Sequence, residues 1–295
     1  MRKKLELMLL LLVITASGCG AQIEDTNEAA LAVATLPVET SELSGEDLDE
    51  DTKDRTVDNK EGKEEQQTNA EDAPLTGIDE EAWELYAAAQ AKMEALTARE
   101  EHSMVYTTQE DETGRVEQSI QVRVKFTGLG SEQAQLSAAG TVKVNDEVIP
   151  LEIYYRDGYV YTSGASGRVK GQSTFEETAA TVDILGGLSK ELIRDYITAI
   201  RQISYADGSV IIELAFKGDI NGMDTMGTGE VILNEEGYVI SQKFDLQAEV
   251  TVEGIPAMVR QSAECILINY GSDVTDVEFP DLSTYLDATI LQEAN

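Results

Sequence analysis

The chain has 295 residues and is strongly acidic, since 56 Asp and Glu residues stand against 22 Lys and Arg, for a net charge of −34. A surface of this sign is repelled by phosphate backbones and by anionic lipid headgroups. The composition therefore excludes nucleic acid and heparin-like polymers as partners. Only two cysteines are present, Cys19 and Cys265, and a pair so placed does not form the disulfide framework of a small secreted domain.

Residues 1–18 have the layout of a secretory signal peptide. Three basic residues follow the first methionine, and an apolar run then extends from Leu7 to Ile14. A run of this length is too short to cross roughly 30 Å of hydrocarbon as a permanent helix. The order of a basic and then an apolar segment is typical of an export signal that is removed from the mature protein.

The segment Ala16-Ser17-Gly18-Cys19 resembles the lipobox of bacterial lipoproteins. The resemblance implies cleavage between Gly18 and Cys19, and attachment of diacylglycerol to the thiol of Cys19. The protein would then be held by its acyl chains on the extracytoplasmic face of the cell membrane, because two or more chains anchor a protein stably. The alternative is an ordinary secretory signal followed by a chance cysteine, which the scarcity of cysteine in this chain disfavours.

Residues 19–77 are predicted to be a disordered acidic tether that follows the lipidated cysteine. Residues 20–77 contain no aromatic residue, and their 17 acidic and 4 basic residues give a net charge of −13. A segment of low hydrophobicity and high net charge cannot offset the entropy lost on folding. At about 5 to 6 Å times the square root of its length, such a coil typically reaches roughly 40 Å from the membrane.

Residues 78–295 are predicted to form the folded domain, because all 17 aromatic residues lie there. A helix is expected at 79–101, with Asp79 as its N-cap and apolar residues at three- and four-residue spacing, among them Trp83, Tyr86 and Met93. Alternating apolar and polar residues then predict strands at 116–126 and 134–144. Turn signals include Asn145-Asp146, Asp157-Gly158, Asp207-Gly208 and Glu236-Gly237.

A central helical insert is expected at 173–203. Its apolar stripe is formed by Leu185, Leu188, Leu192, Ile193, Tyr196, Ile197 and Ile200. Strands are expected again from Val210, and the longest one, 240–252, pairs with 257–270. The stretch Gly218–Gly227 is interpreted as a loop, either a plain hairpin connection or one whose two methionines lie at the mouth of a cavity.

The predicted fold class is α+β, a strongly curved antiparallel β-sheet covered by an N-terminal helix and a central helical insert. This order, in an exported lipoprotein, resembles the LolA/LolB-type lipoprotein-carrier superfamily, the LppX and LprG type lipid-carrying lipoproteins, and related Gram-positive lipoproteins of undefined role. The residues that carry the resemblance are Ala88–Leu96, Asn234–Val239, Asn269-Tyr270-Gly271 and Val277–Pro280.

The resemblance implies a half-barrel whose open side is covered by helices and whose apolar interior holds acyl chains. Plain core packing is the alternative for each residue taken alone. The candidate residues that would line the cavity are Trp83, Tyr86, Met93, Val122, Val124, Leu188, Leu192, Tyr196, Leu246 and Val250.

No catalytic, metal or cofactor site is expected. The single histidine, His102, is placed just past the first helix, and no Gly-x-Ser-x-Gly motif accompanies it. Zinc would need a cluster of cysteine and histidine that the chain lacks. The acidic run Asp47–Asp51 begins like a calcium-binding loop, but Thr52 stands where that loop needs glycine.

The leading functional hypothesis is a monomeric, non-enzymatic, membrane-anchored protein that binds or carries a lipid or another hydrophobic ligand. The alternative is a surface interaction or sensor module that binds a protein or an envelope polymer and has no ligand cavity. A closed apolar space of several hundred Å³ would favour the first hypothesis, and dense packing would favour the second.

Overall fold

A computed structural model describes residues 74–164, 167–183, 192–220, 223–252 and 255–287. The predicted signal peptide, the predicted cleavage site at Gly18–Cys19 and residues 19–73 of the predicted lipidated tether lie outside these residues, whereas residues 74–77 of that tether are described. Leu185 and Leu188 of the expected central insert lie outside the described residues as well.

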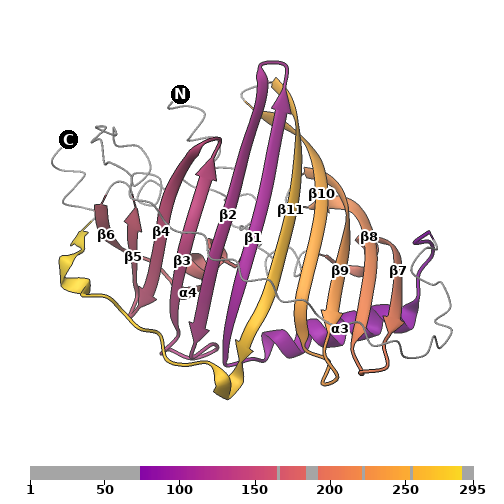
Figure 1. Ribbon diagram of the computed structural model, residues 1–295, viewed down its shortest axis with the longest axis horizontal. Coiled ribbons are helices and arrows are strands. Elements are labelled where there is room, and N and C mark those ends of the chain that lie inside the picture. Colours follow the sequence, from indigo (N-terminus) through magenta and orange to yellow (C-terminus); the bar gives the residue numbers. More distant parts are fainter. Residues whose placement is uncertain (1–73, 165–166, 184–191, 221–222, 253–254, 288–295) are drawn as a thin grey trace, which may run out of the picture. The chain divides into compact units, whose positions relative to one another are not determined.

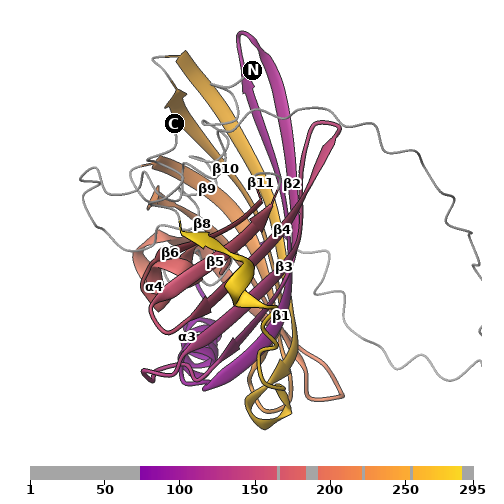
Figure 2. The ribbon, with the colours of Figure 1, turned by 90° about the vertical axis from the view of Figure 1, so that its left-hand side faces the viewer.

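The described residues form one sheet of twelve strands (Figure 1). Its order is β12-β6-β5-β4-β3-β2-β1-β11-β10-β9-β8-β7, and every pair is antiparallel except β12 with β6. Seen from the side, the sheet is curved (Figure 2), so the predicted fold class is confirmed. The strands are β1 Ala98–Asp111, β2 Gly114–Thr127, β3 Gln135–Val144, β4 Glu147–Arg156, β5 Tyr159–Gly164, β6 Gly167–Gln172, β7 Ile197–Ser204, β8 Val210–Ile220, β9 Met223–Leu233, β10 Val239–Val252, β11 Ile255–Tyr270 and β12 Leu286–Asp287.

The alternation of apolar and polar residues along the strands decides which face of the sheet is buried. In β2, Val122, Val124 and Phe126 are buried, whereas Gln121 just before them and Arg123 between the two valines are exposed. Successive side chains of a strand point to opposite faces, so one face collects the apolar residues. The β3–β4 and β4–β5 connections fall at the predicted turns, where Asn145, Asp157 and Gly158 have positive φ angles of 54°, 53° and 80°.

Helix α3 spans Glu80–Glu94, and Asp79 caps it by accepting hydrogen bonds from the backbone N–H groups of Glu81 and Ala82. The predicted helix over 79–101 is therefore too long. The chain from Ala98 onward is strand β1, which pairs with β2 on one side and β11 on the other. Backbone pairing with a strand on each side outweighs the modest helix propensity of this charged segment, although the β1–β11 register shifts between Glu100 and Glu101.

The described part of the central insert, 173–183 and 192–203, contains less helix than predicted. Helix α4 covers Phe175–Ala180, and a short 3₁₀ turn, η1, covers Arg194–Tyr196. Ile197 and Ile200 belong to β7 and not to a helix. A register shift between Ile197 and Ala199 brings both isoleucines to the buried side, and a bulge of this kind gives a strand the three-residue spacing of a helix.

The stretch 218–227 is strand rather than the predicted loop, apart from residues 221–222, which are not described. Gly218 and Gly227 stand where other groups lie close to the backbone. A Cβ on Gly218 would lie 2.3 Å from the ring of Tyr196, and a Cβ on Gly227 would lie 2.6 Å from the ring of Phe216. Glycine is required where another group approaches the backbone this closely.

Both helices lie on the concave side of the sheet (Figure 2). Helix α3 packs mainly on β7 and β10, and α4 packs on β3 and β4. The central strands β2, β1 and β11 therefore run between the two helices. The apolar core is formed by the inward side chains of the sheet together with Ala82, Tyr86 and Ala89 of α3.

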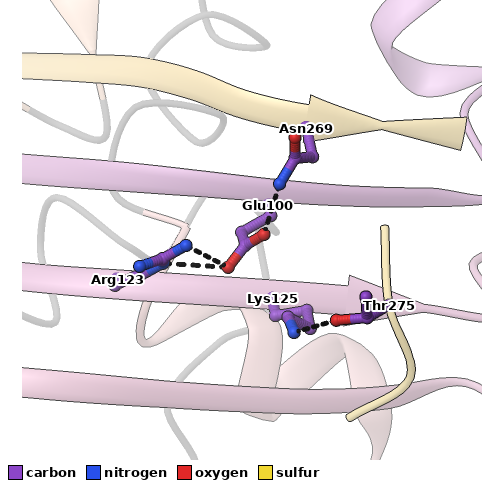
Figure 3. A network of polar contacts seen from close by, with 5 residues as sticks. All are labelled: Glu100, Arg123, Lys125, Asn269 and Thr275. Carbon is purple, nitrogen blue, oxygen red and sulfur yellow. Dashed lines mark hydrogen bonds and ion pairs between the residues drawn. The ribbon is translucent and has the colours of Figure 1, made fainter. Parts of the chain in front are cut away.

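A polar network occupies the opposite face of β1 and β2 (Figure 3). Glu100, only 5% exposed, accepts hydrogen bonds of 2.8 Å from Arg123 and from Asn269. Beside it, Lys125 donates a 2.7 Å hydrogen bond to Thr275 in the C-terminal segment. These bonds connect strands β2, β1 and β11 to the segment that follows β11.

Candidate functional site

A cluster of charged side chains is buried on the concave face of β1. Arg99 and Glu101 are two residues apart and therefore point to the same face, and Asp183 reaches them from the segment after α4. Arg99 forms ion pairs with Asp183 and with Glu101, the latter at 3.3 Å between Nε and Oε2. The side chains of Arg99, Asp183 and Glu101 are 13%, 13% and 7% exposed. Charges this deep persist only when they are paired.

The cluster borders directly on the apolar residues expected to line a cavity. Glu101 lies opposite Val124 in the β1–β2 ladder, and Ser103 lies opposite Val122. The guanidinium carbon of Arg99 lies 4.6 Å from the ring centroid of Phe126, a cation–π distance. The polar cluster and the apolar face of β2 therefore form one continuous surface.

A pocket of about 40 Å³ opens beside this cluster. It lies between the last turns of α3 and strands β1, β10 and β11, and a space of this size admits a few non-hydrogen atoms but not an acyl chain. Its lining residues are Gln90, Met93, Arg99, Glu101, Asp183, Val239, Ile240, Ser241, Gln242, Cys265 and Leu267.

One hydrogen-bond donor in this pocket lacks an acceptor. Among the residues that the structure describes, Nε2 of Gln90 is buried and has no hydrogen-bond partner. Nε of Arg99 makes no hydrogen bond of good geometry either, but it faces Oε2 of Glu101 at 3.3 Å, so its charge is balanced. A buried donor that is left unsatisfied costs roughly 1 to 3 kcal/mol, so such donors mark a place where an acceptor can bind favourably.

Burial changes the acid–base properties of the site. The pKa of Glu101 is raised to about 7, because burial and the charge of Asp183 outweigh the attraction of Arg99. Burial also raises the pKa of the Cys265 thiol far above its ordinary value. Cys265 is a free, buried thiol, and a thiol held protonated is a poor nucleophile.

The residues predicted to line a cavity lie partly in the buried core and partly around it. Tyr86, Val122, Val124 and Leu192 are buried in the core. Trp83, Met93, Tyr196 and Leu246 are partly buried and pack against that core, whereas Val250 is partly exposed near the far end of β10. Of the predicted set, Met93 lines the pocket described above. Leu188 lies outside the described residues.

Sequence reasoning missed Arg99, Glu101 and Asp183. The predicted helix over 79–101 placed the first two at a solvated helix end, and Asp183 fell inside the expected insert. The sequence contains one signal for them. Val105, Ser103, Glu101 and Arg99 occupy every second position, so in a strand they share one face. Charged residues at inward positions of a strand are rare without a partner, so this pattern predicts a buried ion pair.

His102 is a half-buried residue of β1 on the face opposite the pocket, and not a residue at a helix end. In the described part of the chain, no group of three or more His, Cys, Asp or Glu residues is arranged to hold a metal ion. The same residues include no helix that is both long and apolar enough to cross a membrane.

No protein-family model matches the chain, and no curated protein matches its sequence. Several solved structures are similar to it in arrangement. The match to LprF from Mycobacterium bovis covers 70% of this chain and 98% of the LprF chain, at 11% sequence identity and a TM-score of 0.42. The match to a structure of lipovitellin, which is described with its lipid–protein interactions, covers 63% of this chain and 26% of the lipovitellin chain, at 9% sequence identity and a TM-score of 0.36. The match to a DUF1329 family protein from Desulfovibrio piger covers 70% of this chain and 98% of that protein's chain, at 8% sequence identity and a TM-score of 0.27.

Proposed function

We propose that this protein is a membrane-anchored, extracytoplasmic, non-enzymatic lipoprotein that binds or carries a lipid or another hydrophobic ligand as a monomer. Acyl chains on Cys19 provide the anchor, and the acidic tether lets the domain work away from the membrane surface. The ligand lies on the concave face of the sheet, over strands β2, β1 and β11.

One observation carries the proposal: the central strands present an apolar concave face that runs between the two helices. Val122 and Val124 of β2 and Ala263 of β11 lie on this face and are at most 1% exposed, so a ligand would have to reach them from the partly buried margin. Farther along, Leu246 of β10 is only partly buried. An apolar concave surface of this kind is the usual lining of a small-molecule site, with a few polar groups at fixed points.

A second candidate function is a surface module that binds a protein or an envelope polymer without a cavity. It is favoured by the dense packing of strands β9 and β10, where a Cβ on Gly229 of β9 would lie 2.4 Å from the ring of Phe244 in β10. At this position the strands and the aromatic ring leave no space for a ligand. Packing of this kind is what a module without a cavity would show.

The test is to purify the full chain carrying Cys19→Ser, which has no acyl chains of its own, and to examine it by native mass spectrometry and lipid extraction. We expect a bound apolar molecule. Leu246→Gln, on the concave face, should lower the amount recovered severalfold. The matched control is Ile266→Gln on the opposite face, where Ile266 is already 38% exposed, and it should leave recovery unchanged.

Repeated recovery of a folded, ligand-free protein would contradict the carrier function. In that case crosslinking in cells should trap one protein partner through the second function.

A further inference from the structure

We infer that the small pocket beside Arg99 is a subsite for the neutral, oxygen-bearing end of the ligand, such as the hydroxyl or ester group of an acylglycerol. The inference rests on the proposed function, because it assumes that a hydrophobic ligand lies on the concave face. It adds which chemical group of that ligand is recognised, and by which side chains.

The unsatisfied amide of Gln90 defines the kind of group that fits. Nε2 of Gln90 is a donor that is buried without an acceptor among the described residues, whereas Nε of Arg99 already faces Oε2 of Glu101. A hydroxyl or carbonyl oxygen can accept from the amide, whereas an ammonium group has no lone pair to offer. The pocket therefore selects an acceptor and disfavours a cationic headgroup.

The charges around the pocket disfavour an anionic headgroup. The single guanidinium of Arg99 is already paired with two carboxylates, those of Glu101 and Asp183. A third carboxylate, or a phosphate, would be desolvated next to two like charges, and the described residues that line the pocket include no second cation to balance it. A neutral acceptor meets the Gln90 amide without this cost.

The position and size of the pocket fit the end of a lipid and not its chain. About 40 Å³ accommodates a hydroxyl or an ester oxygen. Met93 and Leu267 of its lining are apolar, and Val124 lies opposite Glu101 in the adjoining ladder. Met93 and Leu267 are only partly buried, whereas Val124 is fully buried, so a ligand whose polar end occupies the pocket can place its acyl chain against Met93 and Leu267.

The test compares two probes with the same acyl chain, monolauroylglycerol and laurate, at about pH 8, where laurate is ionised. Binding of each to the full chain carrying Cys19→Ser is measured by titration calorimetry. Gln90→Leu removes the buried amide donor. Met93→Leu is the matched control, since it changes the same lining without removing a polar atom.

We expect the protein to bind the glyceride more tightly than laurate. Gln90→Leu should weaken glyceride binding by roughly 2- to 10-fold, the range for one hydrogen bond, and should leave laurate binding unchanged. Met93→Leu should change both probes equally or not at all.

Three outcomes would overturn the inference. If laurate binds as tightly as the glyceride, or if Gln90→Leu affects neither probe, the pocket holds only water and the carrier function stands. If Gln90→Leu weakens both probes equally, Gln90 supports the fold and does not recognise the headgroup. If neither probe binds and no apolar molecule co-purifies, this inference and the proposed function both fail.

Discussion

Glu100 and Glu101 show how one step along a strand changes the chemistry of a side chain. They are neighbours in β1 on opposite faces of the sheet. Burial raises the pKa of Glu100, but hydrogen bonds from Asn269 and Arg123 outweigh it, so the pKa lies below its ordinary value. Glu101 is buried beside Asp183 as well as Arg99, and its pKa is raised to about 7.

These opposite shifts predict opposite pH dependences of stability. Glu101 binds its proton more tightly in the folded state than in the unfolded chain, so its contribution is greatest below about pH 4.5 and is lost as pH rises toward 7. Glu101→Gln should therefore gain stability relative to the parent chain between about pH 5 and 8. Denaturant unfolding at a series of pH values measures this difference.

Glu100→Gln is the control for that experiment. The pKa of Glu100 is lowered in the folded state, so its contribution is present above about pH 4.5 and is lost as pH falls below that value. Glu100→Gln should cost stability at neutral pH and little in acid. Parallel pH profiles for the two variants would contradict the assignment of the two carboxylates to different environments.

Gly229 illustrates a residue whose lack of a side chain is structural. In Gly229→Ala the new Cβ would lie 2.4 Å from Cε1 of Phe244 and 3.1 Å from Cδ1 of Leu214. Overpacking of this kind typically costs about 1 to 3 kcal/mol, so the free energy of unfolding should fall by that amount. Gly171→Ala in β6 is the matched control, because its Cβ would meet no atom within 4 Å. Equal stability of the two variants would show that Phe244 moves freely.

At the scale of elements, α3 depends on its first turn. Asp79 accepts hydrogen bonds of 3.0 and 3.2 Å from the backbone of Glu81 and Ala82. Its own backbone N–H donates to the carbonyl of Ile200 in β7, at 3.1 Å. The residue thus fixes both the start of the helix and its position against the edge strand β7.

Asp79→Ala should lower the free energy of unfolding by about 1 kcal/mol, the usual cost of losing an N-cap. Asp79→Asn keeps an acceptor oxygen and should retain most of the stability. Thermal unfolding followed by circular dichroism measures both variants. A loss as large in Asp79→Asn as in Asp79→Ala would show that the negative charge at the helix end matters more than the hydrogen bonds.

At the scale of the whole molecule, anchoring and folding are expected to be separable. Cys19 lies in the lipobox-like segment, and the residues of the sheet begin far along the chain. Cys19→Ser should release the protein from carbonate-washed membranes while its circular dichroism spectrum and unfolding midpoint remain unchanged. Persistence of that variant in the membrane fraction would contradict a lipid anchor at Cys19.

The sequence alone allowed the sheet, its long closing strands and the N-cap of α3 to be predicted. Period-two alternation in β2 and β10 and the turn signals at Asn145 and Asp157 are local properties, which a single sequence displays directly. The lipobox-like segment is local as well, and the export and anchoring that it implies stay predictions.

Only the tertiary structure decided where helix gives way to strand around Arg99 and Ile197, and that 218–227 is strand. At Arg99 the outcome depends on backbone pairing with β11, from the other end of the chain. At Gly229 the need for glycine depends on the aromatic ring of Phe244 in the neighbouring strand β10. The pocket beside Arg99 likewise combines residues from α3, β1, β10, β11 and the segment after α4. Contacts between residues so distant in sequence leave no local pattern, because each becomes favourable only once the sheet has formed.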